Sequence, residues 1–316
     1  MTKWLVPKKP RRLFILVTLL ALIVAGDWFY RRWRPEHEVR TEHYVIHSTA
    51  TLEQTAEIGR VVEVLYAAYG KLFAGFPKVS QAHPRLKLKL FKDRREFRRC
   101  NRMIGWAEAF YREPYCHAYY SETELNRYHW MLHEAVHQLN HEVAGLRLAR
   151  WLNEGLATYF STSVMTEGQL TPGQIDPNTY PIWWLDEFAV SGDLAADVAT
   201  TRFIPLRAII SGKGGPDLDA HFNLYYVQWW SLTHFLLHHE GGKYREPLLR
   251  VMEKGGTLES FEENIGPVER VQGEWHRYRQ AQQESLRAIP LSQSKTAGTP
   301  SVVIRPNAPA APGPPR

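Results

Sequence analysis

Residues 127–160 read RYHWMLHEAVHQLNHEVAGLRLARWLNEGLATYF and contain the most informative motif of the chain. Within them, His133-Glu134-Ala135-Val136-His137 forms an H-E-x-x-H motif. Residues four apart lie on one face of a helix, so both imidazoles can reach one Zn²⁺ at roughly 2.0–2.1 Å. Glu134 lies beside the fourth coordination position, where a general base is needed. The motif therefore predicts a helix that carries a metal site.

A third metal ligand is expected because a catalytic zinc keeps three protein ligands and one open position. Glu154 follows in Trp151-Leu152-Asn153-Glu154-Gly155, where most of its neighbours are apolar. A carboxylate on an apolar helix face costs free energy unless it is paired or bound to a metal. Glu154 is therefore the predicted third ligand. The alternative is an exposed glutamate at the start of an amphipathic helix.

Other histidines repeat the four-residue spacing. His129 and His141 extend the series on either side of the motif, but only the central pair has Glu at the next position. We predict surface or supporting positions for these two. His234 and His238 are also four apart, in an apolar and aromatic stretch, where packed or exposed helix histidines are favoured over a metal pair.

The rest of the chain predicts an α+β fold. Alternating residues rich in β formers indicate strands at 43–49 and 85–91 and a third near 115–120, and helical spacing of apolar residues covers 52–74. Asp93 is a candidate N-cap for a helix through about residue 101. From Arg127 onward the pattern is almost wholly helical. Strands and helices come first and helices follow, as in α+β proteins.

Charge is distributed unevenly along the 316 residues, which carry a net charge of +6. Eight of the 39 basic and one of the 33 acidic residues lie in residues 1–34, which leaves 31 basic and 32 acidic residues in the body. The body is not basic and contains no motif of a nucleic-acid module, so no nucleic-acid partner is expected. Two cysteines exclude a disulfide scaffold. The spacing of Cys100 and Cys116 leaves their pairing open.

The two ends of the chain differ from the body. The apolar run Leu13–Gly26 lies between basic residues, and with residues 27–30 it approaches the length of a membrane span. Residues 1–34 are predicted to be an uncleaved signal anchor in the inner (cytoplasmic) membrane, with the catalytic domain outside the cytoplasm. The alternatives are a cleaved signal peptide, which would give a secreted protein, and a buried soluble helix. Residues 287–316, rich in Pro and Ala, are predicted to be a disordered tail.

The H-E-x-x-H motif followed by Trp151-Leu152-Asn153-Glu154-Gly155-Leu156-Ala157 resembles the gluzincin metallopeptidases, in which a glutamate on the next helix completes the zinc site. The segment W-L-N-E-G is close in sequence to the corresponding segment of the M1-type aminopeptidases. The peptidase-MA-like proteins of bacteria, including the DUF1570 family, match better in size and in the order of their elements. This resemblance implies a gluzincin-like catalytic domain over residues 35–286, with an N-terminal strand and helix region and a mainly helical C-terminal half.

A second stretch, Tyr225-Tyr226-Val227-Gln228, resembles the later helix of these families, whose tyrosine stabilises the oxyanion of the tetrahedral intermediate. Tyr226 fits that position, Tyr225 is the fallback, and core aromatics on an amphipathic helix are the alternative. The sequence also departs from the family pattern. It has no G-A-M-E-N segment, so aminopeptidase specificity is not supported. Thr158 stands where some gluzincins carry an acid that orients a zinc-bound histidine.

These observations predict a membrane-anchored zinc metallopeptidase of the bacterial cell envelope that acts on a peptide or protein substrate. Zn²⁺ on His133, His137 and Glu154 would activate a water molecule, with Glu134 as the general base and Tyr226 as the oxyanion donor. One alternative is a non-catalytic, metal-stabilised binding or scaffold domain, and another is hydrolysis of a non-peptide amide or ester. The oligomeric state is not predicted.

Overall fold

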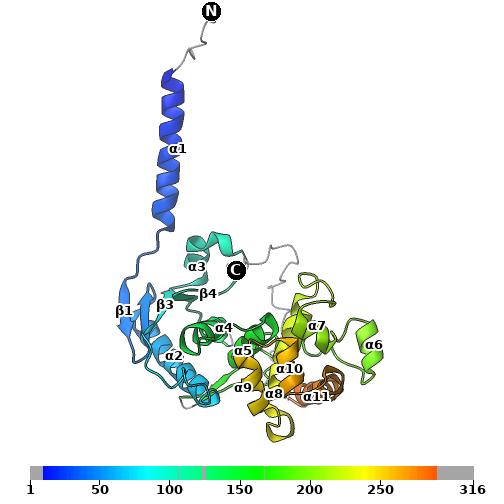
Figure 1. The fold of residues 1–316 in the computed structure, drawn as a ribbon. Coiled ribbons are helices and arrows are strands. Elements are labelled where there is room, and N and C mark those ends of the chain that lie inside the picture. Colours follow the sequence, from blue (N-terminus) through cyan, green and yellow to red (C-terminus); the bar gives the residue numbers. More distant parts are fainter. Residues whose placement is uncertain (1–9, 106, 123–125, 167, 290–316) are drawn as a thin grey trace, which may run out of the picture.

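The computed structural model describes residues 10–105, 107–122, 126–166 and 168–289, with the side chains at 10–12 and 28–30 left aside. Within these ranges the fold has a sheet in the N-terminal half and a mostly helical C-terminal half (Figure 1). The predicted α+β class is confirmed. Of the tail predicted for residues 287–316, residues 290–316 lie outside the described part of the chain.

The sheet has five strands in the order β1-β2-β3-β5-β4: β1 (His37–Arg40), β2 (Tyr44–Ser48), β3 (Leu86–Phe91), β5 (Tyr115–Tyr119) and β4 (Phe110–Arg112). The three central strands run parallel, and the edge strands β1 and β4 pair antiparallel to their neighbours. The strands predicted at 43–49, 85–91 and 115–120 are β2, β3 and β5. The two edge strands were not predicted, because strands of 4 and 3 residues are too short to show a clear alternation.

Two helices cover the apolar face of the sheet. Helix α2 (Leu52–Leu72) begins with a capping box formed by Thr51 and Gln54 and packs on β1 and β2. Helix α4 (His129–Gln138) packs on β4 and β5. Their apolar side chains and those of the strands form one core, which includes Ile46, Leu88 and Val136. The short helix α3 (Arg94–Cys100), capped by Asp93 as predicted, forms a separate cluster with β3 and β5.

The C-terminal half is built around α5 (Arg150–Ser161), which lies between α4 and α8 (Phe222–His238). The five-residue π-turn η2 (Leu139–Val143) continues α4. The remaining helices and the β6–β7 hairpin complete this half: β6 (Val164–Thr166), β7 (Gln169–Thr171), α6 (Leu194–Ala199), α7 (Leu206–Ser211), α9 (Arg245–Glu253), α10 (Leu258–Asn264) and α11 (Val268–Arg287), with the 3-10 turns η3 (Ile182–Trp184) and η4 (His239–Gly241). The 3-10 turn η1 (Arg102–Ile104) follows α3 in the N-terminal half.

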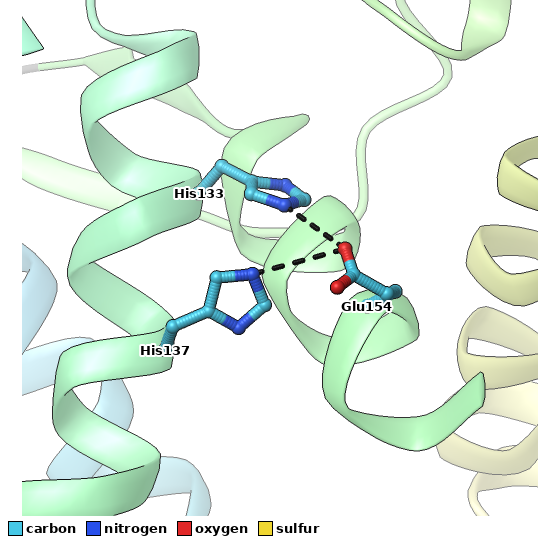
Figure 2. A group of neighbouring side chains, drawn as sticks. All are labelled: His133, His137 and Glu154. Atoms are coloured by element: carbon cyan, nitrogen blue, oxygen red, sulfur yellow. Dashed lines mark hydrogen bonds and ion pairs between the residues drawn. The ribbon is translucent and has the colours of Figure 1, made fainter. Parts of the chain in front are cut away.

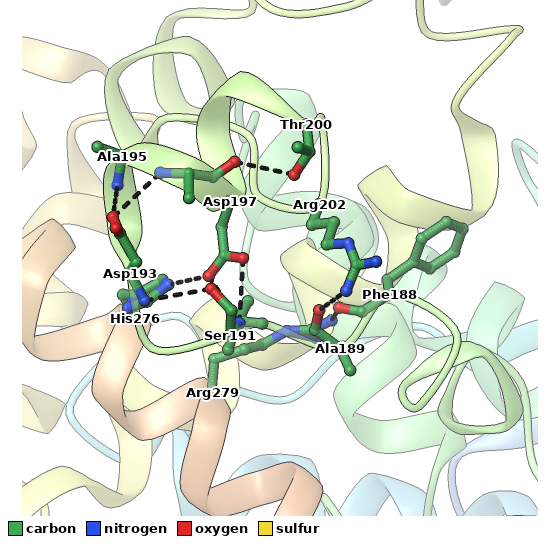
Figure 3. A network of polar contacts seen from close by, with 12 residues as sticks. Phe188, Ala189, Ser191, Asp193, Ala195, Asp197, Thr200, Arg202, His276 and Arg279 are labelled. Atoms are coloured by element: carbon green, nitrogen blue, oxygen red, sulfur yellow. Dashed lines mark hydrogen bonds and ion pairs between the residues drawn. The ribbon is translucent and has the colours of Figure 1, made fainter.

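A buried polar network joins α11 to the segment that leads into α6 (Figure 3). Nε2 of His276 lies 2.8 Å from Oδ2 of Asp197, and the backbone N–H of Ser191 donates to both Asp197 oxygens at 3.0 and 2.9 Å. Nη2 of Arg279 donates to the carbonyl oxygen of Phe188 at 3.1 Å. These contacts tie the last helix to a loop distant in the sequence.

The N-terminal apolar run folds as α1 (Pro10–Arg31), which projects from the rest of the molecule (Figure 1). The fourteen residues of the run extend about 21 Å as a helix, which is less than a hydrocarbon core of about 30 Å. In the part of the chain that the structure describes, no helix is both long enough and apolar enough to cross a membrane. The predicted single-pass anchor, and the localisation that depended on it, are therefore wrong.

Candidate metal centre

Three side chains from two adjacent helices converge at the predicted metal site (Figure 2). His133 and His137 lie one turn apart on α4, and Glu154 reaches toward them from the second turn of α5. Oε2 of Glu154 lies 3.3 Å from Nε2 of His133 and 3.7 Å from Nε2 of His137. One ligand atom from each residue lies within 4.8 Å of the others. The structure thus brings together all three predicted ligands.

The close approach of α5 to its neighbours depends on Gly155, the residue after Glu154. A Cβ atom at Gly155 would clash with Oγ1 of Thr233 and would lie 2.8 Å from the carbonyl oxygen of Trp229, both on α8. Only a residue without a side chain lets the two helices pack this closely. This contact explains the glycine of the W-L-N-E-G segment by packing and not by chemistry at the site.

A chain of hydrogen bonds sets the position of α5 against the N-terminal half. The hydroxyl of Tyr69 on α2 donates to Oδ1 of Asn140 at 2.8 Å, and Nδ2 of Asn140 donates to Oδ1 of Asn153 at 3.1 Å. Asn140 lies in the π-turn η2 that follows the motif, and Asn153 directly precedes Glu154. These hydrogen bonds therefore tie the two ligand-bearing helices to each other. Single π-turns in α-helices occur frequently at functional sites, as this one does.

The carboxylate of Glu154 and the imidazole of His133 shift each other's pKa values. Burial alone would raise the pKa of Glu154, but the charges of His137 and His133 and hydrogen bonds from His133 and Tyr226 lower it to about 2. Burial would lower the pKa of His133, but the hydrogen bond to Glu154 and the charges of Glu134 and Glu154 raise it. Glu154 is therefore held as a carboxylate, the form that binds a metal ion.

Glu134, the predicted general base, is held by the edge strand β4. Its Oε2 accepts a hydrogen bond of 2.8 Å from the backbone N–H of Tyr111. The hydroxyl of Tyr111 lies 3.1 Å from Nδ1 of His141 and donates to Oε1 of Glu142 at 3.0 Å. Tyr111 thus anchors β4 to α4 and η2 at two points. Sequence reasoning missed this residue, because only the pairing of β4 with β5 brings it beside the motif.

Tyr226 on α8 lies at the site and Tyr225 does not. The hydroxyl of Tyr226 donates to Oε2 of Glu154 at 2.9 Å, whereas that of Tyr225 donates to the carbonyl oxygen of Pro216 at 2.8 Å. The pKa of Tyr226 is raised by burial and by the nearby charge of Glu154, so this hydroxyl keeps its proton. Tyr226 can therefore act only as a hydrogen-bond donor or acceptor here.

Aromatic rings extend from Tyr226 along one side of the site. The ring of Tyr180 lies 5.5 Å from that of Tyr226, and the rings of Trp130 and Trp183 each lie 5.6 Å from Tyr180. The ring of Phe222, one turn earlier on α8, lies 4.5 Å from that of Tyr226. Trp130, Tyr180 and Tyr226 belong to segments that are distant in the sequence, and their rings meet only through the packing of the fold.

The other histidines of the four-residue series do not join the metal centre. His129 is buried with Nδ1 3.0 Å from the carbonyl oxygen of Ser161, and His141 contacts Tyr111. Nδ1 of His234 lies 2.7 Å from the hydroxyl of Tyr278, and Nε2 of His238 lies 2.8 Å from the hydroxyl of Tyr159. His234 and His238 are thus packed helix histidines, in line with the prediction that favoured packed or exposed histidines over a metal pair.

Thr158 does not orient a histidine of the metal centre, and the two cysteines are not paired. The hydroxyl of Thr158 donates to the carbonyl oxygen of Glu154 at 2.6 Å and does not orient a ligand. Among the described residues, no hydrogen-bond partner reaches the buried Nδ1 atoms of His133 and His137. Cys100 and Cys116 do not form a disulfide.

The donor set fits a zinc ion. Two imidazole nitrogens and a carboxylate are the ligands of one known type of catalytic zinc site, and each Nε2 atom here faces the carboxylate. Within the described ranges, this is the one group of three His, Cys, Asp or Glu residues whose ligand atoms lie this close together. The structure therefore contains a candidate metal site, whose preferred ion follows only from the chemistry of the ligands.

Residues 129–260 match a family model described as Protein of unknown function (DUF1570). The matched range runs from the start of α4 into α10 and includes the three ligands, Glu134 and Tyr226. The predicted resemblance to this family is confirmed over that range. No curated protein matches the chain. The match relates the site to an uncharacterised family and assigns no activity.

Proposed function

We propose that this protein is a zinc-dependent peptidase of the gluzincin class. The observation that carries the proposal is the convergence of His133, His137 and Glu154, with Glu134 beside them and the Tyr226 hydroxyl on Glu154. A purely structural zinc site needs no general base and prefers a fourth protein ligand. The presence of Glu134 at the expected position therefore favours a catalytic role.

The residues at the site have separable roles in this proposal. A bound zinc ion would polarise the scissile carbonyl group and lower the pKa of a nearby water molecule. Glu134 would accept the proton of the attacking water through Oε1, because Oε2 is held by Tyr111, and would deliver it to the leaving amine. The Tyr226 hydroxyl would donate to the negative charge that develops on the carbonyl oxygen.

The test is a pair of measurements on the purified protein and its Glu134→Gln variant. We expect about one zinc per chain in both proteins, because Glu134 is not one of the three proposed ligands. Hydrolysis of a broad peptide library should be detected with the natural protein and should fall at least about 10³-fold in the variant. The matched control, Glu253→Gln, changes an exposed carboxylate at the end of α9 and should retain hydrolysis.

Each outcome of these measurements has a distinct meaning. Zinc binding without hydrolysis by the natural protein would favour the non-catalytic scaffold domain. Full hydrolysis by the Glu134→Gln variant would rule out Glu134 as the base. Zinc binding that persists in a His137→Ala variant would rule out the ligand assignment itself.

A further inference from the structure

Basic residues are concentrated in one short part of the body. Residues 85–102 contain nine Lys and Arg but only two acidic residues, whereas residues 35–316 as a whole have a net charge of −1. The stretch forms strand β3, helix α3 and the turn η1. Its basic residues are Arg85, Lys87, Lys89, Lys92, Arg94, Arg95, Arg98, Arg99 and Arg102.

The strand register places part of this charge on the face of the sheet that points away from α2 and α4, which we call the outer face. Residues opposite one another on paired strands point to the same face. One row across the five strands contains Arg40, Val45, Lys87, Tyr115 and Arg112, and the next contains Glu38, His47, Lys89, His117 and Phe110. The outer face thus has four Lys or Arg residues and one acidic residue in two adjacent rows.

The lysines of the outer face pack on aromatic rings and not on carboxylates. Nζ of Lys89 lies 4.3 Å from the ring centroid of Tyr115 and 5.8 Å from that of Trp33, and Nζ of Lys87 lies 5.7 Å from Tyr115. Partial burial lowers the pKa of Lys89. Burial, and then the charges of Lys89 and Arg112, lower the pKa of His117 to about 3. Positive charge is therefore held here without a matching negative charge.

The nearby acids are already paired. Glu38 lies 2.8 Å from Arg40 and 3.5 Å from His47, and at the α3 end of the sheet Glu108 contacts both Arg94 and Arg98. In the described part of the chain, no ion pair involves Lys87, Lys89 or Arg112. The C-terminal residues 290–316 contain three basic residues and no acidic one. The C-terminal segment 290–316 therefore offers no carboxylate side chain that could pair with the outer face, which leaves its lysines open to an acidic partner.

We propose that the outer face binds an acidic polypeptide segment in extended form. Four gaps between strands of about 4.8 Å span roughly 19 Å, which an extended chain crosses in about six residues. Aspartate and glutamate side chains of such a segment would meet Arg40, Lys87, Lys89 and Arg112 in turn.

A polypeptide fits this surface better than a nucleic acid does. Single strands of nucleic acid bind on exposed aromatic rings that stack with bases. Here the Tyr115 ring lies under the two lysines, and Phe110 is stacked on His117 at 4.1 Å. The edge strand β4 also connects the two regions, because Arg112 lies on the outer face while the neighbouring Tyr111 binds Glu134. The outer face points away from α4, which carries two of the proposed metal ligands, so the proposed binding does not require hydrolysis at the candidate metal centre.

The test measures binding by fluorescence anisotropy with a labelled peptide of about eight residues that alternates Glu and Ser. We expect binding by the full-length protein at low ionic strength that weakens steeply with added salt. A Lys87→Gln/Lys89→Gln variant should bind about tenfold more weakly. A Lys71→Gln/Lys213→Gln variant has the same change in net charge, at exposed lysines elsewhere, and should bind within about twofold of the natural protein.

A second variant protects the test against a folding defect at half-buried Lys89. Lys87→Gln/Arg112→Gln changes two exposed residues and should also bind about tenfold more weakly, with an unchanged melting temperature. Equal weakening by the Lys71 and Lys213 pair would overturn the proposal. Tighter binding of a single-stranded oligonucleotide than of the acidic peptide would also overturn it. Because only binding is measured, failure here is distinct from failure of the proposed peptidase function.

Discussion

The hydroxyl of Tyr226 donates a hydrogen bond of 2.9 Å to Oε2 of Glu154, the same oxygen that faces both histidines of the motif. This contact joins α8 to α5 at the point where the ligand set is completed. The two residues are 72 positions apart in the sequence, and their meeting depends on the close packing of these two helices.

A Tyr226→Phe substitution tests the role of this hydroxyl. It keeps the ring and its aromatic contacts but removes the donor. We expect the proposed peptide hydrolysis to fall about 10²–10³-fold while zinc content is unchanged, since loss of one oxyanion donor typically has this effect. The measurement is kcat alongside metal analysis. Tyr225→Phe is the matched control and should stay within about twofold, because its hydroxyl binds Pro216 instead. Equal losses in the two variants would contradict the assignment.

A Gly155→Ala substitution tests the contact between α5 and α8. The added methyl group would meet Thr233 and the backbone of Trp229, so we expect the free energy of unfolding to decrease by about 2–3 kcal/mol. Gly70→Ala is the control. Nothing lies within 4 Å of a Cβ atom there, in helix α2, and the substitution should be neutral or stabilising by up to about 1 kcal/mol. Urea unfolding of both variants checks the prediction, and a stable Gly155→Ala protein would contradict it.

Acid should destabilise the protein through His129. Burial lowers the pKa of His129 to about 3, with the charge of His133 acting in the same direction and the Ser161 carbonyl opposing both. The unfolded chain binds a proton near pH 6.5 that the folded protein does not bind until about pH 3. The free energy of unfolding therefore falls as pH decreases through this window.

The His129→Gln substitution removes this titration. At pH 7 we expect the variant to be less stable than the natural protein, because it loses a packed imidazole hydrogen-bonded to Ser161. That difference should shrink as pH falls toward about 4.5, by up to about 1.4 kcal/mol per pH unit. Urea unfolding at a series of pH values measures it. Parallel stability curves for the two proteins would contradict the prediction, because they would show that His129 takes up a proton equally in the folded and unfolded states.

The buried pair of Asp197 and His276 should contribute to stability (Figure 3). Burial would raise the pKa of Asp197, but hydrogen bonds from His276 and Ser191 lower it, so the residue is a carboxylate at neutral pH. Asp197→Asn leaves these donors with a weaker acceptor, and we expect a loss of about 3 kcal/mol in the free energy of unfolding. Asp193→Asn, at the exposed N-cap of α6, should cost less than about 0.5 kcal/mol, because asparagine also caps helices well. Similar losses in the two variants would contradict a special role for the buried pair.

The sequence predicted the ligand set because the information is local. Spacing along one helix places His133 and His137 together, and the apolar surroundings of Glu154 indicate a carboxylate that needs a partner. Tyr226 followed only from a resemblance between short segments, since nothing in its neighbourhood points to Glu154. Tyr111 left no signal in the sequence, because a three-residue edge strand brings its backbone to Glu134.

The fold shows the same difference between features set by local sequence and features set by contacts between distant segments. Parallel strands β2, β3 and β5 show regular alternation, whereas the network of Asp197 and His276 depends on packing between segments 79 residues apart. The N-terminal prediction failed for a different reason. The length of a membrane span is approached only when residues 27–30, which include Asp27, are counted with the apolar run, and the apolar part of the described helix is shorter than a span.

The position of the three ligands has a mechanical consequence for the molecule. Two of them belong to the helix that packs on the sheet, and the third belongs to the helical half. An ion bound by all three would act as a cross-link between the two halves, beside the hydrogen-bonded chain of Tyr69, Asn140 and Asn153. Neither half alone would retain a complete site, so affinity for the ion would report on whether the two halves are assembled.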